Sequence, residues 1–210
     1  LKENKDPELE DIIQHIDFET LKKIFTEYTR KSGITAPPNV LDSGQIISFD
    51  QSAQGGYSVA RNHIGLNRSK IRESYGGMNN KLIVLKVLLH EETHAVSYGE
   101  CTGLAYFENE KRLREGTSLE KGDILEGRSQ TGYSQVAERE VVGVYRPQIE
   151  YLFARFNEGV TEKLSLEILR KYLHEDINYA SRAEIARFFQ QLRGRPQAYQ
   201  NEVIIVGALI

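Results

Sequence analysis

The stretch VLKVLLHEETHAVSYGE, residues 84–100, constrains the fold most, because an apolar run meets several ionisable side chains within one short segment. A helix that only packed would carry apolar residues, rather than histidines and glutamates, along its buried face. His90 and His94 are four residues apart, so on a helix their imidazoles lie on one face, one turn apart. The stretch therefore predicts a long helix over 80–98 that carries a chemical site near its end.

The residue types of this segment match metal-assisted chemistry. Two neutral imidazoles one turn apart suit a borderline ion such as Zn²⁺. Glu91 follows the first histidine directly and can reach a metal-bound water without being a ligand, which is the H-E-x-x-H arrangement. Glu92, a charged residue between the histidines, is expected to point to solvent or to a neighbouring base. The opposing interpretation is an accidental match in a regulatory or toxin-like module, which would bind no metal.

A catalytic zinc generally needs three protein ligands and one open position, so a third ligand is expected. Glu100 lies six residues after His94, but Ser97 occupies the place where a glycine would allow the chain to turn towards the metal. Glu158, in FNEGVTEKL, is the better candidate. Glu162 lies one helical turn later and could accept a hydrogen bond from the outer nitrogen of a liganding histidine.

With these two motifs in this order, HEETH and NEGVTE (157–162), the chain resembles the gluzincin, or thermolysin-like, branch of zincin metallopeptidases, especially its compact members. The resemblance covers residues 45–170 in outline. It implies zinc ligands His90, His94 and Glu158, with Glu91 as the general base, and one zinc ion per chain.

The resemblance and the residue patterns together predict an α+β, zincin-like fold. We expect a small mixed twisted sheet, whose edge strand packs on the active-site helix, and then a mainly helical C-terminal half. Periodicity and turn residues predict strands at 45–49 and 57–67, and helices at 17–33, 146–164 and from Ser165. They also predict a long surface excursion at 103–140 with one or two short helices or strands, a helix capped by Ser181 and Glu184 and ended by Gly194, and a last helix from Pro196.

A peptide hydrolase also needs a donor for the oxyanion that forms on the attacked carbonyl. Tyr151 lies seven residues before Glu158 on the predicted helix over 146–164, two turns back on the same face, so its phenol could reach the site. His174 is the second candidate, although a histidine beside acidic residues is more often a paired surface residue. Gluzincins use a tyrosine or a histidine for this purpose, so the resemblance allows either residue.

Length and composition limit the remaining alternatives. A chain of 210 residues is long enough for one domain, 1–210, with a sheet-and-helix part at 1–98 and a mainly helical part at 99–210. The formal net charge of −3 argues against nucleic acid as a partner. Cys101 is the single cysteine, which excludes an intrachain disulfide and a cysteine-based zinc cluster and favours a cytoplasmic location. We expect no membrane span, because the apolar part of NEVIIVGALI is too short.

The sequence thus predicts a zinc-dependent metallopeptidase that acts on a peptide or protein substrate. The alternative is an inert, zinc-stabilised interaction domain of the same fold, which would need the metal but not Glu91. Because the chain begins with Leu1 rather than Met, we expect a trimmed N-terminus, which is compatible with a removed signal peptide or propeptide.

Overall fold

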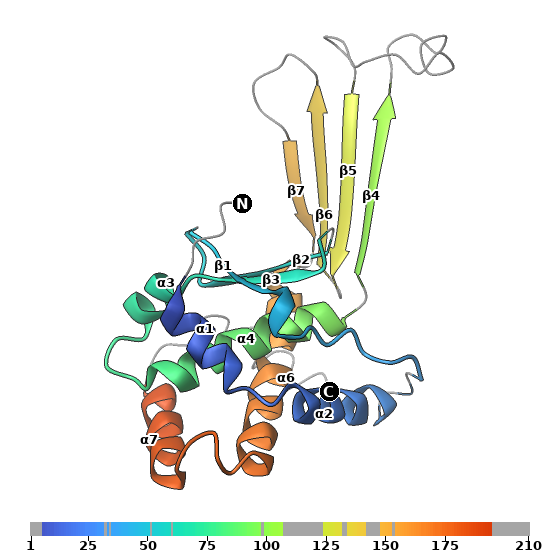
Figure 1. The fold of residues 1–210 in the computed structure, drawn as a ribbon. Coiled ribbons are helices and arrows are strands. Elements are labelled where there is room, and N and C mark those ends of the chain that lie inside the picture. Colours follow the sequence, from blue (N-terminus) through green and yellow to red (C-terminus); the bar gives the residue numbers. More distant parts are fainter. Residues whose placement is uncertain are drawn as a thin grey trace.

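The computed structural model describes residues 6–31, 33, 35–50, 52–59, 61–97, 99–106, 124–131, 134–141, 148–152 and 154–194. For the strands between residues 99 and 152 it describes the backbone. The described part contains six α-helices and two sheets, so the fold is mixed α+β as predicted (Figure 1). Within these residues, no helix combines the length and the apolar character that crossing a membrane requires. The predicted last helix, from Pro196, lies outside the described residues.

The elements follow the chain from helices to a small sheet, then to a central helix, a second sheet and two more helices. The first half contains α1 (Pro7–Gln14), α2 (Phe18–Lys31), the 3₁₀ turn η1 (Ser43–Gln45), β1 (Ile46–Ser48), β2 (Gly55–Ser58), β3 (His63–Leu66), α3 (Arg68–Ser74) and α4 (Asn80–Val96). The second half contains β4 (Gly99–Tyr106), β5 (Ile124–Thr131), β6 (Ser134–Val141), β7 (Gln148–Leu152), α6 (Ala154–Glu175) and α7 (Arg182–Arg193).

Helix α4 is the centre of the molecule. Asn79 caps its N-terminus by accepting a hydrogen bond from the backbone N–H of Leu82, and the following apolar run is buried on all sides. A helix that is apolar all round must be covered all round. Strands β2 and β3 pack on one side of α4, and α6 packs on another (Figure 1). The predicted helix over 80–98 is confirmed.

The three-stranded sheet has the order β1-β3-β2, with β1 parallel and β2 antiparallel to β3. The predicted small mixed sheet with an edge strand on the central helix is therefore present, and the edge strand is β2. The single strand expected at 57–67 is wrong, because the chain turns between β2 and β3. Asn62 in that turn has φ 49°, a left-handed conformation that asparagine tolerates better than most residues.

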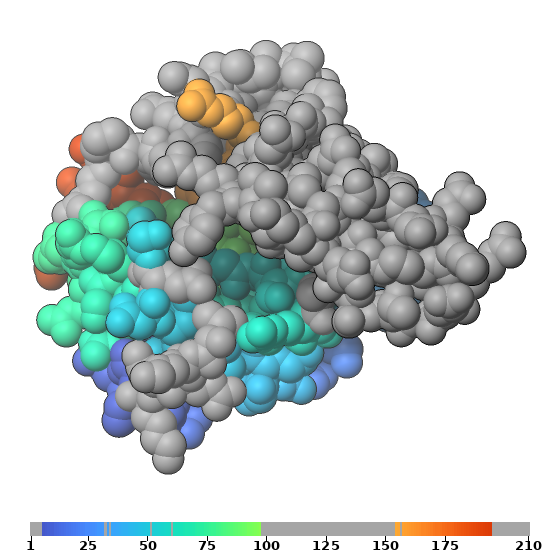
Figure 2. Space-filling model, turned by 90° about the horizontal axis from the view of Figure 1, so that it is seen from above, coloured from blue at the N-terminus to red at the C-terminus, as the bar shows by residue number. Residues whose placement is uncertain are grey.

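One hydrophobic core joins both halves of the chain. It includes Leu9 of α1, Ile24 of α2, Leu85 of α4, Leu169 of α6 and Phe188 of α7, each of them buried. Helix α7 begins as predicted, with Ser181 and Glu184 forming a reciprocal capping box. On the face seen in Figure 2, the coloured residues of the first half, from blue to green, lie side by side.

The second sheet was not expected. Strands β4 to β7 form an antiparallel meander in chain order, which extends away from the helices (Figure 1). The region 103–140, predicted as a surface excursion with one or two short helices or strands, contributes in its described part to three eight-residue strands, β4, β5 and β6. The predicted helix over 146–164 is wrong at its start, because β7 pairs with β6. A mainly helical C-terminal half is found only from Ala154 onward, where α6 continues through Ser165 without a break.

Candidate metal centre

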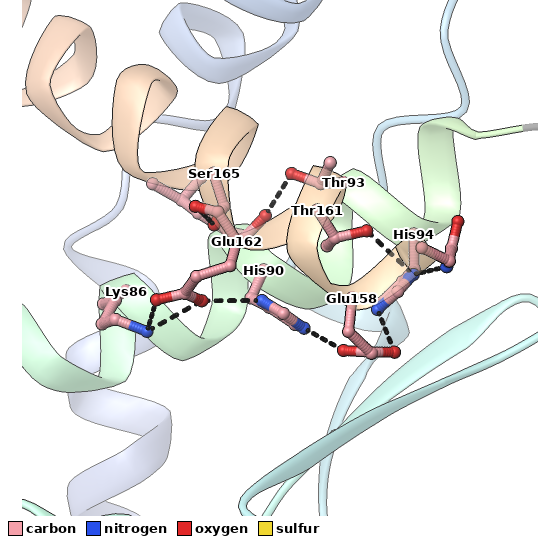
Figure 3. Close-up of polar contacts among 10 residues, drawn as sticks. Lys86, His90, Thr93, His94, Glu158, Thr161, Glu162 and Ser165 are labelled. Atoms are coloured by element: carbon pink, nitrogen blue, oxygen red, sulfur yellow. Dashed lines mark hydrogen bonds and ion pairs between the residues drawn. The ribbon is translucent and has the colours of Figure 1, made fainter. Parts of the chain in front are cut away.

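The site lies where α4 meets the first turns of α6. On α4, His90 and His94 point towards α6, with their ring centroids 5.0 Å apart and their planes at 78° (Figure 3). This is the arrangement that a four-residue spacing on a helix produces. Both rings are largely buried, with 13% and 11% of the side chains exposed.

Helix α6 brings Glu158 to both histidines. One carboxylate oxygen lies 3.0 Å from Nε2 of His90 and the other lies 3.3 Å from Nε2 of His94 (Figure 3). The carboxylate therefore bridges the two imidazoles. The structure thus brings together the three residues that the sequence singled out as ligands.

The geometry of these three groups fits a metal ion. One potential ligand atom from each residue lies within 4.8 Å of the other two. The ligand atoms of a tetrahedral zinc stand about 3.3 Å apart when each metal–ligand bond is about 2.0–2.1 Å. The two distances between Glu158 oxygens and histidine Nε2 atoms, 3.0 Å and 3.3 Å, are close to that spacing. His90, His94 and Glu158 could therefore hold a metal ion, and the donor set by itself does not identify which one.

The outer nitrogens of both histidines also meet α6. Nδ1 of His90 lies 3.0 Å from Oε2 of Glu162. Nδ1 of His94 lies 3.4 Å from the Asn157 amide and 3.5 Å from the Thr161 hydroxyl. A hydrogen bond donated by Nδ1 leaves the Nε2 lone pair free for a metal, so Glu162 lies where a partner of a liganding histidine is expected.

The electrostatics of the cluster favour a positive charge between its carboxylates. Burial alone would lower the pKa of His90, but its hydrogen bonds to Glu158 and Glu162 raise this pKa to about 9. Burial raises the pKa of each of these two carboxyls, but their contacts with His90 and other cationic neighbours lower both values to about 2. The two carboxylates therefore favour a positive charge on or beside the ring of His90.

Glu91 lies beside the cluster and faces the edge strand β2. It is 8% exposed and accepts a hydrogen bond from the backbone N–H of Tyr57. Burial raises the pKa of Glu91, and the neighbouring charge of Glu158 raises it further, while the two histidines lower it. Gly55 lies directly against this carboxylate, since a Cβ at Gly55 would stand 2.9 Å from its Oε1.

The expectation that Glu92 points to solvent is wrong. Glu92 is completely buried and accepts a hydrogen bond of 3.1 Å from the backbone N–H of Leu41. Its other oxygen has no hydrogen-bond partner among the described residues. Burial raises the pKa of Glu92 to about 8, although the Leu41 hydrogen bond lowers it.

Neither candidate for the oxyanion donor, Tyr151 or His174, lies in the position predicted from the sequence. His174 is exposed in the last turn of α6, 16 residues from Glu158, which corresponds to about 24 Å along a helix. His174 is therefore excluded from the site. Tyr151 lies on β7, where its backbone pairs with Val136, so the argument that it shares a helix with Glu158 is wrong. The side chains of Tyr151 and of Glu100, on β4, lie outside what the structure describes.

Two neighbours of the site were not predicted. Lys86 binds Glu162, and Gly55 makes room for Glu91. Lys86 gave a signal that could have been noticed, because it is the one charged residue in the run from Leu82 to Leu89 and precedes His90 by one helical turn. The contact of Gly55 with α4 depends on the fold and has no local sequence signal.

No family model, curated protein or solved structure matches this chain.

Proposed function

We propose that the protein is a zinc-dependent peptidase that holds one zinc ion per chain through His90, His94 and Glu158. The observation that carries this proposal is the bridging position of Glu158 between the two Nε2 atoms, with the buried Glu91 beside the cluster. Two imidazoles and one carboxylate, with a further position open, form a typical donor set for catalytic zinc.

The protein residues have separate tasks in this proposal. When bound, zinc would lower the pKa of a water molecule and polarise the carbonyl of the substrate. The carboxylate of Glu91 accepts a proton from the attacking water and later passes this proton to the leaving amine. Its burial under β2 favours this role, because burial raises its pKa and thereby makes the carboxylate a stronger base. Glu162 keeps the ring of His90 oriented by accepting the hydrogen bond from Nδ1.

Tyr151 remains the proposed donor to the oxyanion, now for a different structural reason. It lies at the end of β7, which leads into the helix that carries Glu158. Replacement of Tyr151 by phenylalanine removes the hydroxyl and keeps the ring. We therefore expect Tyr151→Phe to bind zinc normally and to turn over more slowly.

The proposal is tested by measuring metal content and peptide cleavage together. Protein purified without an affinity tag is analysed for bound metals and incubated with a diverse peptide library. We expect wild type to contain one zinc per chain and to cleave, and His94→Ala to lose stoichiometric zinc. If Glu158→Ala keeps its zinc while Glu100→Ala loses it, the third ligand is Glu100.

Glu91→Gln separates a peptidase from an inert zinc domain. The substitution preserves the shape of the side chain but cannot accept the proton, so we expect normal zinc content and a loss of turnover of about 10²- to 10⁴-fold. Glu10→Gln, at an exposed position of α1, is the matched control and should cleave as wild type does. Equal cleavage by Glu91→Gln would refute the role of Glu91. Zinc without any cleavage in wild type would favour the inert domain.

A further inference from the structure

Lys86 is a buried cation behind the candidate metal centre. It lies on α4, one turn before His90, and only 6% of the residue is exposed. Its ammonium group lies 2.9 Å and 3.2 Å from the two oxygens of Glu162 (Figure 3). Its ammonium also lies 5.8 Å from the centre of the Tyr75 ring. A lysine is rarely buried to this extent unless it is paired, so its position calls for a physical reason.

The chain of contacts runs from Lys86 through Glu162 to His90. Oε1 of Glu162 lies closest to the ammonium of Lys86, while Oε2 lies 3.0 Å from Nδ1 of His90. Both sides of the ion pair are nearly removed from solvent, with 7% and 5% of the side chains exposed. A carboxylate held from two directions in this way has little freedom to rotate.

The charges in this region also require Lys86. Glu91, Glu158 and Glu162 together carry three negative charges when they are ionised. A divalent ion bound by neutral histidines would supply two positive charges, which leaves one negative charge in a poorly solvated space. Lys86 supplies the missing positive charge. Burial of an uncompensated charge is strongly unfavourable, so a neutral cluster is far more stable than a charged one.

We propose that Lys86 is a positioning residue of the metal centre, which holds Glu162 in the orientation that fixes the ring of His90 and thereby raises the affinity for a divalent ion. The proposal rests on the metal site that the proposed function uses, but it does not depend on peptide cleavage. Lys86 is not among the three residues that could hold the ion. It acts through Glu162.

The first test is the zinc affinity of Lys86→Met, measured by competition with a chelator of known affinity. Methionine has a similar length and carries no charge. Loss of a partner that orients a liganding histidine lowers metal affinity by about 10- to 100-fold, and we expect a loss of about 10-fold or more. Lys81→Met is the matched control, because Lys81 lies on the same helix with its ammonium over the Tyr179 ring. Wild-type affinity in Lys86→Met would overturn the proposal.

The double variant Lys86→Met/Glu162→Gln tests whether Lys86 acts through Glu162, and it remains useful if Lys86→Met alone does not fold. Both buried charges are absent, so neither is left unpaired. If Lys86 acts through Glu162, the double variant binds zinc as Glu162→Gln does, to within about twofold. A zinc affinity of the double variant that is a further 10-fold below that of Glu162→Gln would show that the two residues act independently. That result would overturn the proposal that Lys86 acts through Glu162.

A readout on metal-free protein separates this inference from the proposed function. The Nδ1 proton of His90, held by a buried carboxylate, should exchange slowly with solvent and give a resolved downfield signal in proton NMR. We expect this signal in wild type and in Lys81→Met, and its loss in Lys86→Met. A protein that shows this difference but cleaves no peptide would contradict the peptidase proposal and support the role of Lys86. An unchanged signal in Lys86→Met would contradict the role of Lys86.

Discussion

At the scale of single residues, Gly55 controls how closely β2 approaches Glu91. A Cβ at this position would stand 2.9 Å from Oε1 of Glu91, 3.0 Å from its Cγ and 3.0 Å from Cγ1 of Val87. A contact of 2.9 Å is shorter than real Cβ contacts and 3.0 Å is tighter than most of them, so either the strand or the glutamate must move. Neither movement is easy, because Glu91 is buried and also bound to the backbone of Tyr57.

We therefore expect Gly55→Ala to displace the Glu91 carboxylate and to reduce turnover of the proposed reaction, while destabilising the fold by about 1–3 kcal/mol through overpacking. Peptide cleavage and urea denaturation measure the two effects. Gly56→Ala is a close control, since a Cβ there would meet nothing within 4 Å. If both variants behave alike, contact with Glu91 is not the reason for a glycine at position 55.

Glu92 predicts a dependence of stability on pH. In the unfolded chain this carboxyl ionises near its ordinary pKa of 4.5, whereas burial holds the folded pKa at about 8. The folded state therefore keeps the proton over a range in which the unfolded state has lost it. The contribution of Glu92 to stability is largest below pH 4.5, falls as the pH rises from 4.5 to 8, and is constant above pH 8.

The measurement is urea denaturation of wild type and Glu92→Gln at several pH values, with a chelator present so that metal binding does not contribute. Glutamine keeps an oxygen for the Leu41 N–H and does not titrate. We expect the difference in unfolding free energy between the two proteins to change in favour of Glu92→Gln by at most about 1.4 kcal/mol per pH unit between pH 5 and pH 8. If the unfolding free energies of the two proteins depend on pH in the same way, the pKa of Glu92 is not raised by folding.

At the scale of elements, β3 depends on a close contact with Phe49. Gly65 lies in the middle of β3, paired with Ile47 of β1 and Gly56 of β2. A Cβ at Gly65 would stand 2.8 Å from Cδ1 of the Phe49 ring. Phe49 is buried, with 7% of the residue exposed. The ring therefore covers the backbone of the central strand.

We expect Gly65→Ala to push this ring off β3 and to lower the free energy of unfolding by about 1–3 kcal/mol, without a direct effect on the zinc ligands. Urea denaturation measures the loss, and zinc content serves as the check that the site persists. The double variant Gly65→Ala/Phe49→Leu, with a smaller side chain over the strand, should recover part of the stability. Stability equal to that of wild type in Gly65→Ala would mean that the ring has room to move.

The elements also show what could be predicted from the sequence. Helices α4 and α7 follow local rules, since an asparagine or serine cap and an apolar pattern are encoded within a few residues. The helix expected from 146 is wrong where β7 lies, because the pairing of β7 with β6 is a tertiary interaction that no local pattern encodes. Within α6, the hydroxyl of Ser165 donates to the carbonyl of Glu162, so a residue that suits a helix start lies inside the helix.

The candidate site divides in the same way. His90 and His94 could be placed together because their four-residue spacing acts within one helix. Glu158 needed a second motif, since it lies 68 residues from His90 in the chain. Lys86 stands out in the sequence as the one charge in an apolar run, but its partner Glu162 could not be assigned, because it is 76 residues away and no local pattern joins the two.

At the scale of the whole molecule, the cluster connects the two halves of the chain. The histidines belong to α4 in the first half, and both glutamates that contact them belong to α6 in the second half. These two helices also pack through the common hydrophobic core. An ion held between them would bind the folded protein and not the unfolded chain, in which the ligands are far apart. Its binding energy therefore adds to the stability of the entire fold.

We expect zinc to raise the thermal midpoint of wild type and to leave that of His94→Ala unchanged. A ligand at 100 times its dissociation constant stabilises the folded state by about 2.7 kcal/mol. For a domain of this size, that energy corresponds to a shift of about 5–10 °C. Calorimetry or circular dichroism with and without zinc measures the shift, and a chelator should reverse it. His15→Ala, at an exposed histidine of the C-terminal cap of α1, controls for zinc bound at the surface. An equal shift in His94→Ala would place the ion elsewhere in the protein, because two of the three ligands cannot hold zinc as tightly as the complete set.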